Sequence, residues 1–96
     1  MPKVTVELGG RKLAVAPASL KSVKRWLTAL KETQAGTVEY LDEVEEFIFS
    51  ALRRADQDLD RDWLASELDE TNIAKVIAKV YEAGRLGSGE TQGEAS

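Results

Sequence analysis

Thr37-Val-Glu-Tyr-Leu-Asp-Glu-Val-Glu-Glu-Phe-Ile-Phe-Ser-Ala-Leu-Arg-Arg-Ala55 is the stretch on which the fold depends. Thr37 is a good N-cap, and the apolar residues after it recur at three- and four-residue steps, which predicts a helix over residues 38–55. At ~100° per residue its core side spans roughly 140°. The residues on that side are Tyr40, Leu41, Val44, Phe47, Ile48, Ala51, Leu52 and Ala55. We expect this helix to be the centre of the molecule.

Two apolar residues of this helix, Val38 and Phe49, fall outside that sector, on a side that also carries acidic residues. If the hairpin and the other helices enclose the helix, both residues are buried. If they do not, an apolar spot rimmed by acids marks a partner site, and a tryptophan of the preceding helix is a further contact where it is uncovered. Both interpretations remain open. The candidate partner-binding residues are Val38, Asp42, Glu45, Glu46, Phe49 and Trp26.

Upstream of the central helix, residues 3–15 alternate apolar and polar residues around Gly9-Gly10, a pair that readily adopts the positive φ of a tight turn. This pattern predicts a β-hairpin. A helix over about residues 19–34 follows, with Ser19 as its cap. Its apolar stripe is Leu20, Val23, Leu27 and Leu30, widened by Trp26. We expect this stripe to face the core, and Trp26 and Trp63 are more easily explained as core residues than as contacts.

Downstream, Asp56-Gln-Asp-Leu-Asp-Arg-Asp-Trp-Leu-Ala-Ser-Glu67 has acids at positions 1, 3, 5, 7 and 12 of a possible EF-hand loop. Such a loop needs glycine at position 6 for a left-handed turn, where this chain has Arg61, and a polar residue is usual at position 9, where it has Leu64. The same letters also fit a polar loop and a helix over about 61–68 capped by Asp60. We favour the helix cap and predict no metal site; calcium titration separates the two.

The closing segment is predicted as a helix over about 71–83, capped by Asp69 or Thr71 and ended by Gly84 in a left-handed conformation. Residues 87–96 contain no apolar residue larger than alanine, so we expect a flexible C-terminal tail. The predicted fold class is therefore α+β, mainly α, with an N-terminal hairpin and a small bundle of about four helices in one domain over residues 1–86.

Composition excludes several classes of function. The 96 residues contain no cysteine and no histidine, so thiolate and imidazole ligands, a cysteine nucleophile and the usual general base are all missing. We therefore predict a protein that is not an enzyme and has no cofactor. With no apolar signal segment and no run of ~20 apolar residues, we expect a cytoplasmic protein without a membrane partner.

Charge is distributed unevenly along the chain. Residues 1–31 carry seven basic and one acidic side chain, whereas residues 32–72 carry three basic and thirteen acidic ones. The predicted helix 19–34 is basic enough to suggest nucleic acid, but the neighbouring acidic half would repel phosphate within the Debye length of ~8–10 Å. We expect no nucleic-acid partner and interpret the two halves as complementary surfaces.

The order of three motifs carries a family resemblance. Val4-Thr-Val-Glu-Leu-Gly-Gly-Arg-Lys-Leu-Ala-Val15 precedes a helix ending Ala51-Leu-Arg-Arg54, and Asp58-Leu-Asp-Arg-Asp-Trp-Leu64 leads to Leu68-Asp-Glu-Thr-Asn-Ile-Ala-Lys-Val76 and Gly84. Over about residues 3–86 the chain resembles the phage tail assembly chaperones. Members of that family typically combine a Gly-Gly-Lys/Arg hairpin with an Asp-Leu turn and a Leu-Asp-x-x-Asn helix.

The resemblance implies a viral protein of a long-tailed phage or prophage that is absent from the finished virion. Such chaperones bind the long, helical tape measure protein in the host cytoplasm and assist assembly of the tail tube around it. In many relatives a frameshifted longer form contacts the tail tube protein. No binding residue is carried over, because no family binding motif is matched. Whether the chain also self-associates weakly is left open.

Two other classes of function remain. An acidic regulator or antitoxin-like inhibitor would use residues 39–46 to attract a basic partner. A DNA-associated regulator of the winged-helix type is disfavoured, because only the helix over 19–34 is basic and a winged helix usually places its hairpin after the recognition helix. Co-purification separates the first of these from a chaperone, and salt-sensitive DNA binding would support the second.

Overall fold

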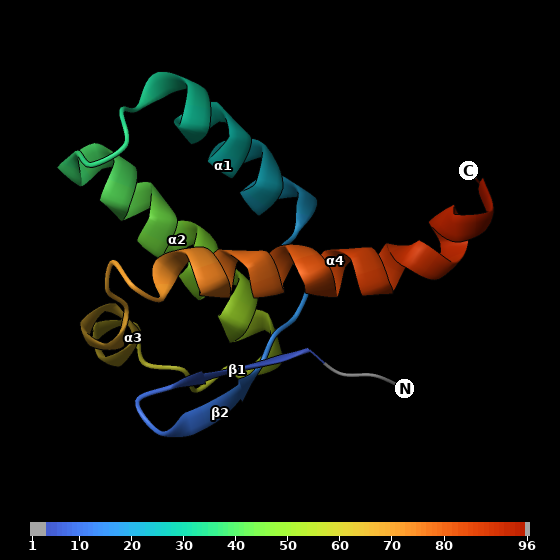
Figure 1. The fold of residues 1–96 in the computed structure, drawn as a ribbon, viewed down its shortest axis with the longest axis horizontal. Coiled ribbons are helices and arrows are strands. Elements are labelled where there is room, and N and C mark those ends of the chain that lie inside the picture. The colour runs from blue at the N-terminus through green and yellow to red at the C-terminus, as the bar shows by residue number, and fades with distance from the viewer. Residues whose placement is uncertain (1–3, 96) are drawn as a thin grey trace.

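The computed structural model describes the backbone of residues 4–95 and the side chains of residues 4–85. In this part of the chain an antiparallel β-hairpin precedes four helices (Figure 1). The elements are β1 (Thr5–Leu8), β2 (Arg11–Ala14), α1 (Leu20–Glu32), α2 (Val38–Ala55), α3 (Arg61–Glu67) and α4 (Ile73–Ala95). The predicted fold class, α+β with mainly helix, is confirmed.

The hairpin forms as its sequence predicts. Thr5 lies opposite Ala14 and Leu8 opposite Arg11, and the N–H of Val15 donates to the carbonyl of Val4 at 2.9 Å, which extends the pairing by one residue. Gly9 and Gly10 both have positive φ, 54° and 78°, as the two central residues of a type I′ turn require. The predicted start at residue 3 lies outside the described residues. The alternating apolar residues of the hairpin are buried against the helices: Val4, Val6, Leu8, Leu13 and Val15.

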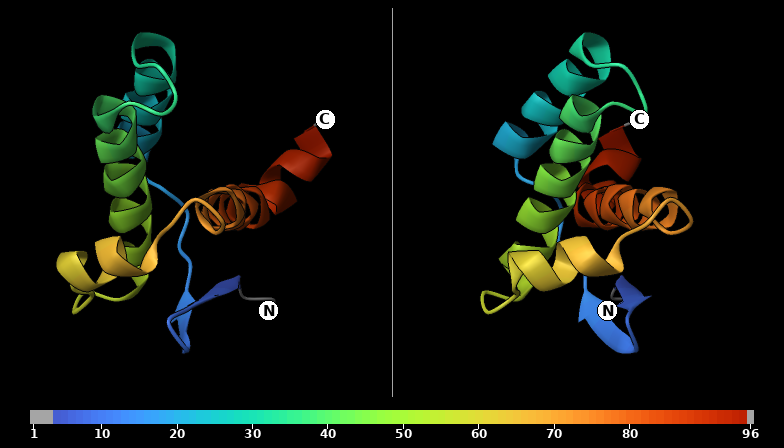
Figure 2. Two further views of the ribbon diagram at one scale, coloured as in Figure 1. Left: turned by 60° about the vertical axis from the view of Figure 1, so that its left-hand side comes forward. Right: turned by 90° about the vertical axis from the view of Figure 1, so that its left-hand side faces the viewer.

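α2 is the central helix, in contact with α1, α3, α4 and β2. The middle of its predicted apolar sector is confirmed, because Val44, Phe47, Ile48, Ala51 and Leu52 are at most 2% exposed. The ends of the sector are not buried: Leu41 is 46% exposed, and Ala55 is also exposed. Figure 2 shows α4 crossing the α1–α2 pair below the first turns of α2, and Leu41 in those turns borders an open pocket with Leu68 and Ile73.

α1 turns a different side to the core from the one predicted. Trp26 and Ala29 are buried, at 3% and 6% exposure, whereas Leu20, Leu27 and Leu30 are 74%, 51% and 44% exposed. The predicted inward stripe of leucines is therefore wrong. The tryptophan explains the orientation, because a large ring gains most from burial and its N–H needs an acceptor. Its indole stacks on Phe47 with ring centroids 5.0 Å apart and donates from Nε1 to the Tyr81 hydroxyl at 2.8 Å.

α3 begins as predicted and ends one residue earlier, with Leu68 as its C-cap. α4 begins at Ile73, after Asp69 has accepted hydrogen bonds from the N–H groups of Thr71 and Asn72 at 2.8 and 3.1 Å. Asp69 thus caps the turn that leads into α4, and the helix begins two residues later than predicted.

α4 does not end at Gly84 as predicted. Gly84 lies inside the helix without positive φ, and the backbone helix continues to Ala95, through most of the predicted tail 87–96. A glycine inside a helix costs only about 1 kcal/mol relative to alanine, and an existing helix gains a hydrogen bond with each added residue. Gly84 alone is therefore a weak stop signal. Residue 96 lies outside the described residues.

Candidate functional site

The exposed apolar side of α1 is the main surface feature of the described residues. Leu20, Val23, Leu27 and Leu30 follow one another at steps of three, four and three residues, so they line one side of the helix. We call these four residues the leucine face. Three of them are exposed, and only Val23 is partly buried against the core. Single exposed leucines need no explanation, but a continuous row of them on one helix marks an interaction surface.

Aromatic residues adjoin one edge of the leucine face. Val23 and Leu30 lie one turn before and one turn after Trp26, whose ring is 6.1 Å from that of Tyr40. Tyr81 of α4, which accepts the Trp26 N–H, is itself 41% exposed. The hydrogen bond to Trp26 therefore places one partly exposed aromatic ring of α4 beside α1.

Lysines line the other edge of the leucine face. Lys24 and Lys31 follow Leu20 and Leu27 by one turn each, and both are exposed. The ion pairs of the described residues leave Lys24 and Lys31 without an acidic partner. These positive charges are thus available to an external group.

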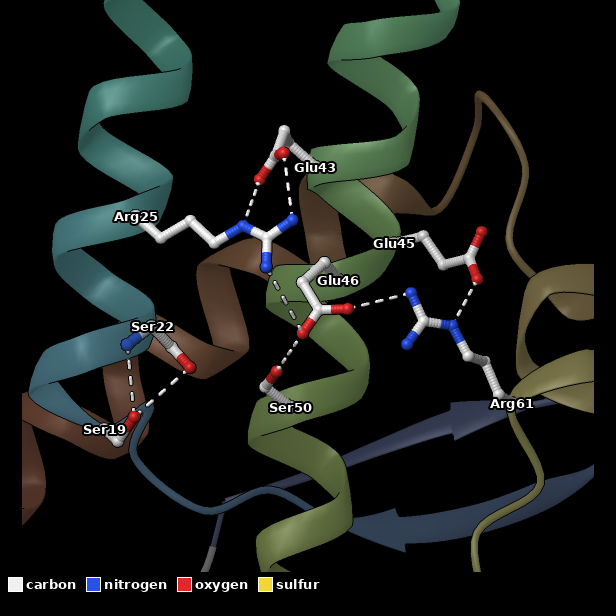
Figure 3. Close-up of polar contacts among 8 residues, drawn as sticks. All are labelled: Ser19, Ser22, Arg25, Glu43, Glu45, Glu46, Ser50 and Arg61. Atoms are coloured by element: carbon white, nitrogen blue, oxygen red, sulfur yellow. Dashed lines mark hydrogen bonds and ion pairs between the residues drawn. The ribbon is translucent and has the colours of Figure 1, made fainter.

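The opposite side of α1 is held to α2 by an ion-pair network that also includes α3 (Figure 3). Arg25 of α1 binds Glu43 in bidentate fashion, at 2.8 and 3.1 Å. Arg61 of α3 donates to Glu45 at 2.7 Å and lies 2.9 Å from Glu46, which is 3.9 Å from Arg25. Bidentate arginine–carboxylate pairs fix geometry better than single contacts do. The network therefore fixes which side of α1 remains free.

Glu46 is the carboxylate of this network that lies within ion-pair distance of both Arg25 and Arg61. Partial burial raises its pKa, but the hydrogen bonds from Arg61 and Ser50 and the two guanidinium charges lower it by more, so the net pKa is below the usual value. The hydrogen bond to Glu45 raises the pKa of Arg61. Both net shifts favour the charged forms, as expected for groups held in ion pairs.

The candidate residues taken from the sequence do not form one site. Val38 is 71% exposed, and Asp42 beside it is also exposed. Phe49 lies eleven residues further along α2, about 16 Å away at 1.5 Å per residue. It is partly buried, and the guanidinium groups of Arg61 and Arg53 lie 5.0 and 5.8 Å from its ring centroid. Two arginines therefore partly cover Phe49, and Glu46 and Asp58 line the same open pocket.

The remaining candidates have internal partners. Glu45 and Glu46 belong to the ion-pair network, and Trp26 is buried. The sequence signal that would have located the exposed side of α1 is Trp26 itself. Trp26 lies beside a row of apolar residues that repeats every seven positions. The helix therefore has two apolar sides, and only one of them can face the core.

In the acidic segment after α2, Asp60 is the N-cap of α3. Asp60 accepts the N–H of Trp63 at 3.0 Å, as predicted, and Asp56 accepts the N–H of Asp58 at 3.1 Å. Arg61, at the position where a calcium loop needs a left-handed residue, does not have positive φ. Among the side chains of residues 4–85, no group of three or more acids is arranged to hold a metal ion.

Comparison of the chain with protein-family models, with curated proteins and with solved structures gives no match. Within the part of the chain that the structure describes, no helix is both long and apolar enough to span a membrane. The leucine face, its lysine edge and the resemblance of the sequence motifs are the features that bear on function.

Proposed function

We propose that the chain is a phage tail assembly chaperone that binds the tape measure protein and keeps it competent for tail tube assembly. The leucine face carries this proposal, because three leucines of one helix are exposed while the rest of that helix is fixed by Trp26 and Arg25. A chaperone of an amphipathic helical protein needs such a surface on a stable scaffold.

The mechanism is competition for apolar surface. A helical segment of the tape measure protein packs its apolar side on the leucine face and is thereby withheld from association with other copies. Each buried leucine contributes about 1.5–3 kcal/mol, which suits a contact that must later be released. The function needs no cofactor and no catalytic group. Contact with the tail tube protein through a frameshifted longer form stays a prediction.

Co-expression with the tape measure protein tests the proposal. We expect the tape measure protein to be soluble and to co-purify with the wild-type chain. The Leu27→Asp variant should lose both effects while it keeps its helical circular dichroism. A matched control is Lys12→Glu, an exposed substitution on β2 far from α1 in the fold. Aggregation of the tape measure protein in the presence of the wild-type chain, to the same extent as with Leu27→Asp, would refute the proposal.

The same experiment addresses the alternatives. Isolation of a small basic protein in place of the tape measure protein would favour the antitoxin-like class. Salt-sensitive DNA binding would favour the DNA-associated class. In either case the leucine face would not be a binding surface for the tape measure protein.

A further inference from the structure

We propose that the leucine face binds one helix in coiled-coil packing, and that the bound helix carries an apolar heptad stripe with acidic residues beside it. This inference deepens the proposed function and rests on it for the identity of the partner. It adds the chemistry of the segment that is recognised and the residues that recognise it.

The spacing of the leucine face is that of a coiled-coil seam. Leu20, Val23, Leu27 and Leu30 occupy successive a, d, a and d positions of two heptads. A strict 3.5-residue period keeps a row of side chains facing a second helix that winds around the first. Val23 packs partly against the core, but Leu20, Leu27 and Leu30 remain outside it, because α1 contacts α2 and α4 mainly through Arg25, Trp26 and Ala29. One helical partner is therefore missing from the seam.

The charges beside the seam specify the partner. In the same register Lys24 and Lys31 occupy the two e positions, where residues of paired helices form interhelical ion pairs. Neither lysine has an acidic partner among the described residues. Glutamate or aspartate at the facing positions of a bound helix would complete both pairs. A helix with lysines at those positions would be repelled.

The same register argues against a second copy of this chain as the occupant. In an antiparallel pair of α1 helices e positions face e positions, so lysine would meet lysine. In a parallel pair e faces g, and the g positions are Ser19 and Trp26, neither of which is acidic. Charge complementarity therefore selects a different, acidic helix.

Access to the seam is open in the fold. Figure 2 shows α1 and α2 side by side as one layer, with α4 crossing that layer and its C-terminal half extending away from it. The exposure of Leu20, at 74%, is highest at the start of the seam. The exposed leucines of the seam are therefore accessible to a second helix.

Two synthetic peptides test the inference without the tape measure protein. Both are about three heptads long with leucine and isoleucine at a and d; one has glutamate at e and g, and the other has lysine there. Fluorescence anisotropy gives the affinity of each for the wild-type chain. We expect the glutamate peptide to bind at least about tenfold more tightly, because two attractive pairs replace two repulsive ones.

Charge reversal gives the decisive comparison. The double variant Lys24→Glu, Lys31→Glu should prefer the lysine peptide, whereas Lys75→Glu, an exposed change on α4, should behave as wild type. Leu27→Asp should bind neither peptide. Circular dichroism confirms that each variant is folded.

Three outcomes would overturn the inference. The first is that the two peptides bind equally well and charge reversal has no effect. The second is that neither peptide binds although the tape measure protein does; this result would leave the proposed function standing. The third is that analytical ultracentrifugation finds a wild-type dimer that Leu27→Asp dissociates. Peptide binding as expected without binding of the tape measure protein would support the inference and refute the proposed function.

Discussion

Replacing all three exposed leucines of α1 should weaken the fold only slightly. The variant is Leu20→Gln, Leu27→Gln, Leu30→Gln. With exposures of 74%, 51% and 44%, the three side chains together bury little more than one whole leucine would. Full burial of a leucine contributes about 1.5–3 kcal/mol, and glutamine keeps part of the same aliphatic contact. We therefore expect a loss of about 1–2 kcal/mol in the free energy of unfolding.

Urea unfolding followed by tryptophan fluorescence and by circular dichroism measures this loss. At about 4–8 °C per kcal/mol for a domain of this size, the melting temperature should fall by roughly 4–16 °C. The control is Trp26→Ala, which should cost about 3–5 kcal/mol because that ring is buried. If the leucines were core residues, each replacement would cost about 2–5 kcal/mol and the triple variant would not fold. An unfolded triple variant would refute the orientation of α1.

Three further predictions concern the contacts that fix the scaffold. Burial raises the pKa of Glu46, but the hydrogen bonds from Arg61 and Ser50 and the two guanidinium charges lower it by more, so the folded-state pKa lies below the ordinary value of about 4.3. The stability that ionised Glu46 contributes is therefore complete above the ordinary value and is lost as pH falls through the lower folded-state pKa. Urea midpoints between about pH 3 and pH 6 should fall with acid in the wild type and fall less in Glu46→Gln. Asp60→Ala removes the cap of α3 and should cost about 0.5–2 kcal/mol in urea unfolding; no change would mean that the cap is not formed. Tyr81→Phe leaves the Trp26 N–H without its acceptor and should cost about 1–3 kcal/mol with a shift in tryptophan emission; an unchanged spectrum would contradict the 2.8 Å bond.

The elements that sequence predicted well are those with strong local signals. A Gly9-Gly10 pair between two alternating segments favours a type I′ hairpin turn, and both glycines have the positive φ that this turn requires. The bounds of α2 were predicted to the residue, because Thr37 caps its start and the apolar period persists to its end. Asp60 was assigned as a cap from its position before Trp63. Each of these depends on neighbours within a few residues.

The side that α1 turns to the core could not be predicted in the same way. A hydrophobic period locates an apolar stripe but does not say what the stripe contacts. The orientation is set by residues far away in sequence, because Trp26 meets Phe47 and Tyr81 and Arg25 meets Glu43. The continuation of α4 past Gly84 has a related cause, because a single glycine costs an established helix only about 1 kcal/mol and does not end it.

The charge beside the leucine face differs most from what the sequence indicates. The acidic residues of α2 suggested an acid-rimmed site, yet Glu43, Glu45 and Glu46 are paired with the arginines of α1 and α3. Pairing removes most of their field at a distance, whereas Lys24 and Lys31 keep theirs beside the leucine face. A chain of net charge −4 therefore presents a positive edge where its exposed leucines are. Because charges act over ~8–10 Å in salt solution, the proposed helix would meet this local positive charge and not the net charge of the chain.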